Sequence, residues 1–179
     1  MIPNKISIHD KPKYVVEMEG DTFLSPKKMK TTASVFLGST IGAHLLIGAK
    51  LKNLKNKTMI EAVNRLTEGL DFDCMIMDNG IENRGHQEFP MPVYFCDPHA
   101  PWQKPHVESD IGLVRRWFIP KGTDLRKVRE KELQIYLNIL NHKKRKSLGY
   151  KSAYEVAFKR GMIDCIPPRT LPDELHFSI

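Results

Sequence analysis

The sequence predicts a single α/β domain, built from a mixed sheet with flanking helices. The chain has 179 residues, a length that suits one domain. Apolar residues make up 41% of it and charged residues 27%, as in ordinary soluble globular proteins. Three β-rich runs come first, and helical and extended patterns alternate after them. This order is typical of a mixed α/β architecture.

The β-rich runs predict a three-stranded meander over residues 14–23, 31–37 and 43–49. Ser25 and Pro26 mark the first turn, and a glycine-containing segment marks the second. The polar residues before this meander include two prolines. We therefore expect residues 1–13 to form an extended N-terminal arm.

The next pattern predicts a helix that opens near Thr58, because Thr58 and Glu61 have the spacing of a capping box. Its apolar residues recur at helical spacing. Short apolar runs then predict strands over residues 72–77 and 92–96. Asp78-Asn79-Gly80 follows the first of these strands as a strong turn signal.

The last third of the chain predicts three helices. The first starts near His106, and its buried stripe consists of Val107, Ile111, Val114 and Phe118. The second runs from about residue 127 or 130 to about 142. The third opens at a capping box formed by Ser152 and Glu155 and continues to about residue 159. We expect one domain over residues 14–165 and an irregular C-terminal tail over residues 166–179.

Several protein classes are excluded by the composition. No apolar run reaches 18 residues, which argues against a transmembrane helix, and the N-terminus lacks the pattern of a secretory signal. The three cysteines are odd in number and far apart, so neither a disulfide framework nor a zinc site is indicated. We expect them to be small core residues in a reducing cytoplasm.

The basic residues are concentrated in one part of the chain. The net charge is +7, and residues 113–160 hold 14 Lys and Arg against 4 Asp and Glu, so the remainder sums to −3. A basic segment beside an acidic one indicates a polyanionic partner and a separate acidic site. The alternative is a solvated basic helix surface.

Three acids occupy positions that suit catalysis. Asp21 ends the first predicted strand, Asp78 ends the strand after the first helix, and Glu108 lies in the first turn of a later helix. Strand ends and helix N-termini converge on one edge of an α/β sheet. Carboxylates held there can share two divalent cations, which activate a water or hydroxyl and stabilise the leaving oxygen in phosphoryl transfer.

Ordered sequence blocks around these acids resemble the catalytic domain of bacterial insertion-sequence transposases, and most closely the insertion-sequence-30 family of DDE transposases. The blocks span residues 2–158 in family order. They are Ile2-Pro3-Asn4-Lys5-Ile6-Ser7-Ile8, Glu19-Gly20-Asp21-Thr22, Asp78-Asn79-Gly80-Ile81-Glu82, Tyr94-Phe95-Cys96-Asp97-Pro98, Trp102-Gln103, Phe118-Ile119-Pro120-Lys121-Gly122-Thr123-Asp124-Leu125 and Leu148-Gly149-Tyr150-Lys151-Ser152-Ala153-Tyr154-Glu155-Val156.

This resemblance implies a ribonuclease-H-like fold, the integrase catalytic core, with a two-metal active site for Mg²⁺ or Mn²⁺. Asp21, Asp78 and Glu108 fall on the family's three catalytic and metal-binding acids. Asp110 competes for the third position. On a helix it points about 200° away from Glu108, whereas Gly112 and Arg115 share the face of Glu108. We therefore prefer Glu108.

The sequence also departs from the family pattern. Met18 replaces a tryptophan, Leu37-Gly38-Ser39-Thr40 replaces a charged segment, and Pro105-His106-Val107 replaces Gly-Thr-Asn. The segment between Asp78 and Glu108 is a few residues shorter than usual. Complete transposases of this type carry an N-terminal helix-turn-helix region that reads the ends of the element. This chain starts just before the catalytic domain, which suggests a fragment or half of a split gene.

Further residues are candidates for contacts with DNA or for support of the metal site. Trp102 and Gln103 are placed to stack on or bond to a nucleotide, although a buried Trp that anchors the loop is an equal alternative. Asn79 and Glu82 are expected to brace the metal site, with plain turn chemistry as the alternative. A histidine metal site formed by His86, His99 and His106 is less favoured than loop roles. The expected phosphate-contacting residues are Arg115, Lys121, Lys143, Lys144, Arg145 and Lys146.

The function predicted from these features is metal-dependent cleavage and transfer of DNA strands at insertion-sequence ends, by a transposase that is a polynucleotidyl transferase. The expected partners are transposon-end DNA, target DNA and further copies of the chain assembled on DNA, with no membrane. The expected location is the cytoplasm, at the nucleoid. Two alternatives remain open: an inactive remnant that binds DNA or an intact transposase, and a ribonuclease-H-like nuclease with another substrate.

Overall fold

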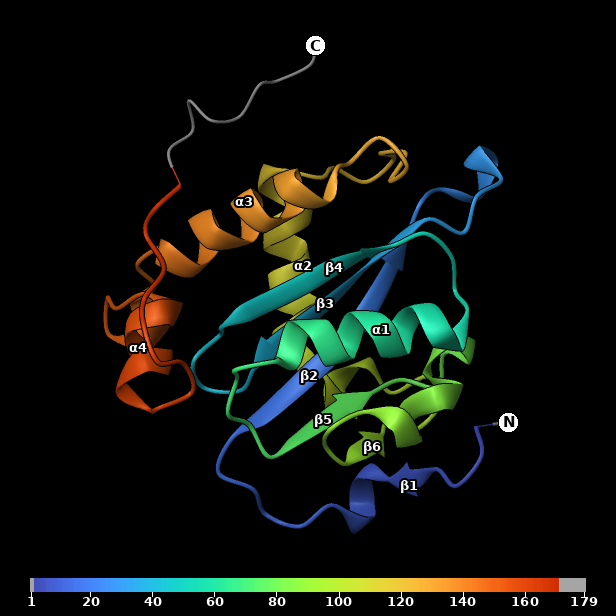
Figure 1. Ribbon diagram of the computed structural model, residues 1–179, viewed down its shortest axis with the longest axis horizontal. Coiled ribbons are helices and arrows are strands. Elements are labelled where there is room, and N and C mark those ends of the chain that lie inside the picture. Colours follow the sequence, from blue (N-terminus) through green and yellow to red (C-terminus); the bar gives the residue numbers. More distant parts are fainter. Residues whose placement is uncertain (1, 171–179) are drawn as a thin grey trace.

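A computed structural model describes residues 2–170, which form a six-stranded mixed sheet covered by helices on both faces (Figure 1). The spatial order of the strands is β1-β6-β5-β2-β3-β4. Strands β2 (Glu17–Leu24), β3 (Ser34–Thr40) and β4 (Leu46–Leu51) form the predicted antiparallel meander. Strands β5 (Cys74–Met77) and β6 (Val93–Phe95) extend it in parallel from β2.

The N-terminal segment takes part in this sheet. Strand β1 (Ile6–Ser7) pairs in parallel with β6, and the short 3₁₀ helix η1 (Ile8–Asp10) follows it. The sequence analysis predicted only an extended arm here, because a two-residue strand carries no periodic signal. Residues 171–179 of the predicted C-terminal tail lie outside the described residues.

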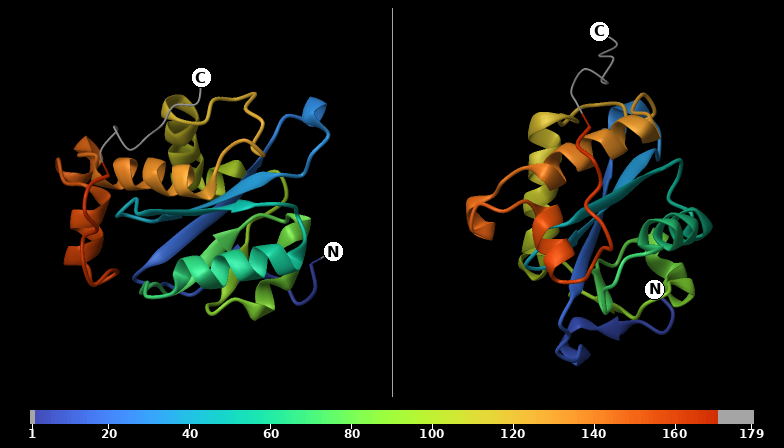
Figure 2. Two further views of the ribbon diagram at one scale, coloured as in Figure 1. Left: turned by 45° about the horizontal axis from the view of Figure 1, so that its top comes forward. Right: turned by 60° about the vertical axis from the view of Figure 1, so that its left-hand side comes forward.

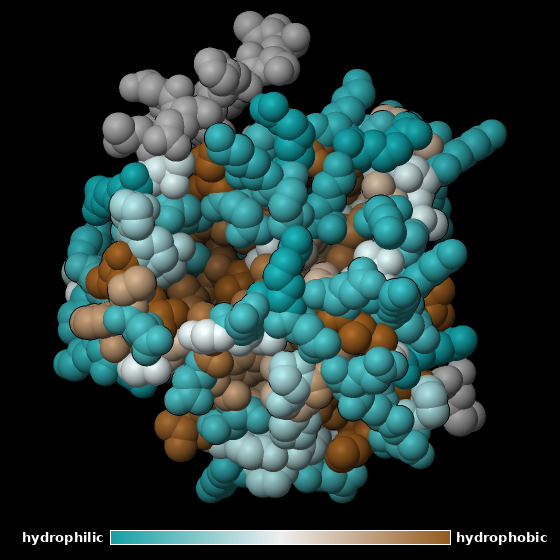
Figure 3. All heavy atoms as spheres, viewed as in Figure 1, coloured by the Kyte–Doolittle hydropathy of each residue, from teal (hydrophilic) through white to brown (hydrophobic). Residues whose placement is uncertain are grey.

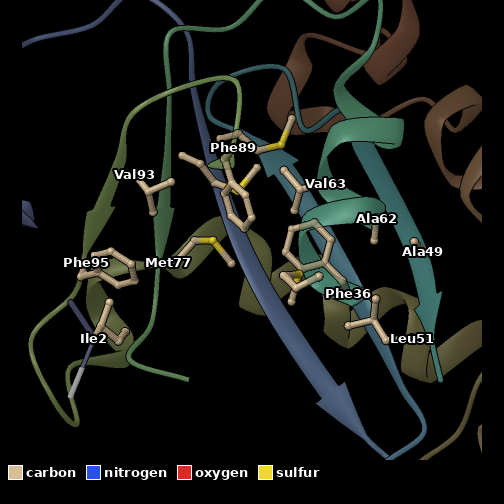
Figure 4. Packing of buried hydrophobic residues seen from close by; sticks show 13 residues of the cluster. Ile2, Phe36, Ala49, Leu51, Ala62, Val63, Met77, Phe89, Val93 and Phe95 are labelled. Carbon is tan, nitrogen blue, oxygen red and sulfur yellow. The ribbon is translucent and has the colours of Figure 1, made fainter. Parts of the chain in front are cut away.

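One face of the sheet is covered by α1 (Asn56–Thr67) and the 3₁₀ segment η3 (Ile81–Glu88), with a core that includes Phe36, Val63 and Phe95 (Figure 4). The opposite face is covered by α2 (Pro105–Trp117) and α3 (Glu130–His142). Figure 2 shows this layered arrangement from two further directions. Because both faces are covered, all residues of β3 are buried.

The predicted stripe on α2 is confirmed, since Val107 and Val114 are fully buried and Ile111 and Phe118 pack against the same core. Helix α3 lies close to the edge strand β4. A β-carbon on Gly48 would come within 3.0 Å of the Leu137 side chain, so glycine permits this approach. The Asn141 side chain also bonds both backbone groups of Leu46, each at 2.8 Å.

One of the two predicted capping boxes is confirmed. Ser152 and Glu155 cap α4 (Ala153–Lys159) reciprocally, as the sequence indicated. The prediction for Thr58 and Glu61 is wrong, because α1 already begins at Asn56 and the Thr58 hydroxyl donates to the Asn53 side chain instead.

The surface of the face seen in Figure 3 is mostly hydrophilic, with hydrophobic residues gathered in a hollow. A cavity of about 290 Å³ lies there between β4, α1 and α3, lined in part by Leu46, Leu66 and Leu137. Within residues 2–170, no helix is long and apolar enough to cross a membrane.

Candidate active site

The three acids singled out from the sequence line one cleft of about 470 Å³. Asp21 comes from β2, Asp78 directly follows β5, and Glu108 lies in the first turn of α2. The other lining residues are Asn79, Gly80, Cys96, Asp97, Pro98, His99, Ala100, Pro101 and Lys104. Segments far apart in the sequence therefore bring three carboxylates to a single opening.

The sheet register explains how Asp21 and Asp78 meet. Strand β2 pairs in parallel with β5 only from Glu17 to Glu19, whereas it pairs with β3 from Met18 to Leu24. Asp21 is thus inside β2 rather than at its end, which corrects the sequence prediction. It lies just past the last residue that pairs with β5, where the chain that follows Met77 turns away and leaves space for both carboxylates.

Helix α2 is fastened to β2 by a buried carboxylate that the sequence analysis overlooked. Glu19 Oε2 accepts hydrogen bonds from the backbone N–H groups of His106 and Val107, at 2.8 and 2.9 Å. Its Oε1 lies 2.8 Å from His106 Nδ1. Helix α2 has no N-cap side chain of its own. Glu19 instead accepts hydrogen bonds from its free N–H groups and offsets the partial positive charge of the helix N-terminus. The signal was available: Glu19 and Asp21 are two residues apart on a strand and therefore share a face.

A second buried carboxylate holds the other side of α2. Asp110 is fully buried and accepts from Ser39 Oγ at 2.6 Å and from Arg145 Nη1 at 2.6 Å, and its Oδ2 lies 3.2 Å from His44 Nδ1. Burial raises the pKa of Asp110, but the His44 and Ser39 hydrogen bonds and the Arg145 charge outweigh it, and the net pKa lies below the ordinary value. Asp110 is not among the residues that line the cleft.

Asp21 and Asp78 influence one another across the cleft. Burial raises the pKa of Asp21, the positive charge of Lys104 opposes that shift, and the neighbouring charge of Asp78 adds to it. The Lys104 ammonium lies 3.4 Å from Asp21 Oδ1. A second cation at this place would relieve the repulsion between the two aspartates.

The turn after β5 orients Asp78. Its Oδ1 accepts from the Gly80 backbone N–H at 3.1 Å and from Asn83 Nδ2 at 3.0 Å. Asn83 is buried, and the sequence analysis missed it because its support comes from a 3₁₀ turn without a periodic pattern. Asn79 Nδ2 donates to the Cys96 carbonyl at 2.8 Å and ties β5 to β6.

Burial, with added repulsion from Asp78 and Asp21, raises the pKa of Glu82.

The donor set fits hard divalent cations, because carboxylate oxygens are the ligands that Mg²⁺ and Mn²⁺ favour. The Lys104 ammonium beside Asp21 further indicates that the cleft accommodates positive charge. Among the described residues, however, no group of three or more His, Cys, Asp or Glu side chains is already arranged to hold a metal ion. Glu108 is exposed at the mouth of the cleft, so joint coordination requires its side chain to turn inward.

The residues expected to contact DNA divide into two groups. Trp102 is 73% exposed, so it does not anchor its loop as a buried residue. Lys121 and Lys146 are also exposed. Lys143 lies over the exposed Trp117 ring, 4.8 Å from its centroid, and Lys144 pairs with Glu155 at 2.5 Å.

The remaining residues that were expected to contact DNA make hydrogen bonds within the protein. Arg145 is committed to Asp110 and largely buried. Arg115 stacks on Phe23 at 4.3 Å and donates to the carbonyl groups of Leu24 and Pro120. The Gln103 side chain bonds Asp97 through both of its ends. These three side chains shape the fold around the cleft.

The histidines and cysteines are dispersed. His86 is buried against Phe95, His99 lines the cleft and His106 contacts Glu19, so they form no common site. Cys74 and Cys96 are buried as expected, but Cys165 is exposed, which contradicts its expected place in the core.

The order of the strands and the position of the cleft define a ribonuclease-H-like α/β fold. A chain of the simian T-cell lymphotropic virus intasome, solved in complex with PP2A regulatory subunit B56 gamma, superposes with a TM-score of 0.64 at 14% identity, covering 91% of this chain and 60% of that one. No protein-family model matches the chain.

Sequence relatives are more specific. The chain is 30% identical over 171 residues to the transposase for insertion sequence element IS1086 of Cupriavidus metallidurans, covering 87% of this chain and 48% of that protein. It is 39% identical over 89 residues to transposase InsI for insertion sequence element IS30A of Escherichia coli K12, covering 48% and 23%. The homologues of this chain are insertion-sequence transposases, which confirms the resemblance found in the sequence. The chain spans about half the length of the IS1086 relative.

The buried pair of Asp110 and Arg145 predicts a pH-dependent loss of stability in Asp110→Asn. At neutral pH the substitution leaves the Arg145 guanidinium buried without its counter-charge, which costs about 3–5 kcal/mol. Because the folded pKa of Asp110 is lowered, its contribution is complete above the ordinary value of 3.8 and disappears as the pH falls through the folded pKa. Urea unfolding should therefore show a gap between wild type and variant that is constant above about pH 5 and narrows below the ordinary pKa of a carboxyl. A gap that is absent at pH 7, or unchanged down to pH 3, would contradict this account.

Proposed function

We propose that this chain is the catalytic domain of a DDE transposase that cleaves and joins DNA strands at the ends of an insertion sequence. The observation that carries the proposal is the meeting of Asp21, Asp78 and Glu108 in one cleft of a ribonuclease-H-like fold. The transposase homologues support the same activity. As a proposal it includes transposon-end and target DNA as partners, a homo-oligomer assembled on DNA, and a place at the nucleoid in the cytoplasm.

Asp21, Asp78 and Glu108 are the residues that would hold Mg²⁺ or Mn²⁺, and we propose two ions. When bound, such ions activate the attacking water or hydroxyl and stabilise the leaving oxygen of an in-line phosphoryl transfer. The contribution of the chain is positional. Glu19 fixes the start of α2 and so the backbone position of Glu108, while Asn83 and the Gly80 amide hold Asp78. We further propose that Asn79 and Glu82, which follow Asp78 in the sequence, help to hold the metal-binding carboxylates in place without binding the metal themselves.

The proposed DNA surface comprises the exposed side chains near the cleft and in the basic segment. Trp102 follows Pro101 at the cleft wall and is free to stack on a base. Lys121, Lys143 and Lys146 expose ammonium groups that can neutralise phosphates. Lys144 joins this surface only by giving up its contact with Glu155.

Glu108→Gln should abolish Mg²⁺-dependent strand transfer while leaving thermal stability and DNA affinity nearly unchanged. The substitution keeps the size and helix propensity of the side chain but replaces an anionic ligand with an amide, which binds hard cations more weakly. The assay offers pre-cut DNA ends at high concentration to the chain, with and without an end-binding region fused to it. Glu61→Gln on α1 is the matched control, because its side chain is 62% exposed and outside the cleft. Asp110→Asn is unsuitable as a control, because Asp110 belongs to the buried support of α2.

Three results would contradict the proposal in different ways. Activity of Glu108→Gln equal to that of wild type would remove Glu108 from the catalytic set. A wild-type chain that is inert even with the end-binding region restored would favour the inactive remnant. Cleavage of RNA–DNA hybrids without strand transfer would favour the nuclease alternative.

Lys146→Ala should weaken DNA binding and flatten its dependence on salt. Each lost phosphate contact lowers the slope of log K against log salt concentration by about 0.9 for duplex DNA. Fluorescence anisotropy titrations at several salt concentrations measure this slope. Lys57→Ala removes another exposed charge, on α1, and should leave the slope unchanged. Equal slopes for wild type and Lys146→Ala would show that Lys146 lies off the DNA surface.

A further inference from the structure

Lys104 is a buried lysine in the cleft with no role in the chemistry described so far. Its side chain is only 6% exposed. The ammonium donates to the Gly20 carbonyl oxygen at 3.1 Å and lies 3.4 Å from Asp21 Oδ1. A buried ammonium is costly unless an opposite charge and hydrogen bonds replace its water. Both compensating contacts come from β2, so Lys104 is tied to the strand that carries Asp21.

The place of Lys104 in the chain makes this burial less favourable still. It immediately precedes α2, where the unsatisfied N–H groups of the helix carry partial positive charge. Glu19 is already engaged with those N–H groups, through His106 and Val107. The acids of the cleft must therefore supply the negative charge that stabilises the ammonium.

The other charged residues that line the cleft are acidic. Among the described residues that line it, Lys104 is the only lysine or arginine, against Asp21, Asp78, Asp97 and Glu108. The Lys104 ammonium therefore supplies positive charge beside a proposed metal-binding carboxylate, as a bound cation would. Unlike a bound cation, it is part of the chain and stays attached to its backbone.

We propose that Lys104 is the internal counter-ion of the active site, which holds Asp21 in place before a divalent cation enters and competes with that cation for the same carboxylate. This inference rests on the proposed function, because it requires that the cleft take up a divalent cation. Lys104 is then a positioning residue that sets the affinity of the site for its metal. Its second contact, with the Gly20 carbonyl, keeps the ammonium beside β2 when Asp21 turns to the metal.

The direct test is a titration of the full chain with Mn²⁺ alone, in which electron paramagnetic resonance measures the free ion. Lys104→Met removes the charge and keeps the length of the side chain. We expect the dissociation constant for Mn²⁺ to fall by about tenfold, because one unit of positive charge within a few ångströms of the site is gone. Lys104→Arg keeps the charge and should bind Mn²⁺ nearly as wild type does. Lys57→Met is the control for net charge, because its side chain is 88% exposed on α1, and should leave the constant unchanged.

Asp78→Asn in the wild-type and Lys104→Met backgrounds identifies the bound ion as the one in the cleft. If Asp78→Asn abolishes binding but Lys104→Met binds Mn²⁺ no more tightly than Lys57→Met, the inference is overturned and the proposed function stands. If no Mn²⁺ binding depends on Asp78 in either background, the metal chemistry of the proposed function fails, and this inference fails with it. Circular dichroism checks the fold of each variant, and Lys104→Gln, with the same expected direction, replaces Lys104→Met if the latter does not fold.

Discussion

The carboxylate of Glu19 is the constraint on which the candidate site depends. It projects from β2 and binds the first free N–H groups of α2, so a strand and a helix that are separated by some 80 residues of sequence share one anchor. Asp21 lies two residues further along the same strand, and Glu108 lies one residue beyond Val107 on the helix. The backbone positions of Asp21 and Glu108 are thus set relative to one another by a buried contact between nearby residues.

Two of the segments that depart from the family pattern contribute contacts that hold α2. Ser39 lies in a replaced segment and donates to Asp110, which secures the far side of α2. His106 lies in another replaced segment and adds a side-chain contact to Glu19. Met18 is fully buried and packs against Gly38, where a β-carbon would come within 2.7 Å of the Met18 sulfur. Ser39 and His106 therefore each contact a carboxylate that holds α2, whereas Met18 packs in the core on the α1 face of the sheet.

The sequence predicts most of the fold because its longer elements carry strong periodic signals. The meander, the stripe on α2 and the cap at Ser152 follow from apolar spacing and local hydrogen bonding. The two-residue strand β1 and the start of α1 escape prediction, since neither has a local pattern that distinguishes it. Asp21 and Asp78 could be found because they lie within family blocks, and Glu108 could be found because it lies in the first turn of a predicted helix. Glu19 and Lys104 were missed because their partners lie far away in the sequence, and Asn83 was missed because a 3₁₀ turn carries no periodic pattern. The hydrogen bond from Arg145 to Asp110 was missed for the same reason as Glu19 and Lys104, since the two residues are 35 positions apart.

Amide hydrogen exchange at His106 and Val107 tests the anchoring role of Glu19 most directly. Glu19→Met keeps a long side chain but removes the acceptor, and Glu19→Gln retains an acceptor oxygen. The account predicts that exchange at these two amides accelerates by about tenfold or more in the Met variant, the effect of losing a buried hydrogen bond. It predicts that the Gln variant restores most of the protection and that amides in α3 are unaffected. Unchanged protection of His106 and Val107 in Glu19→Met would show that something other than Glu19 holds the start of α2, and would contradict the account.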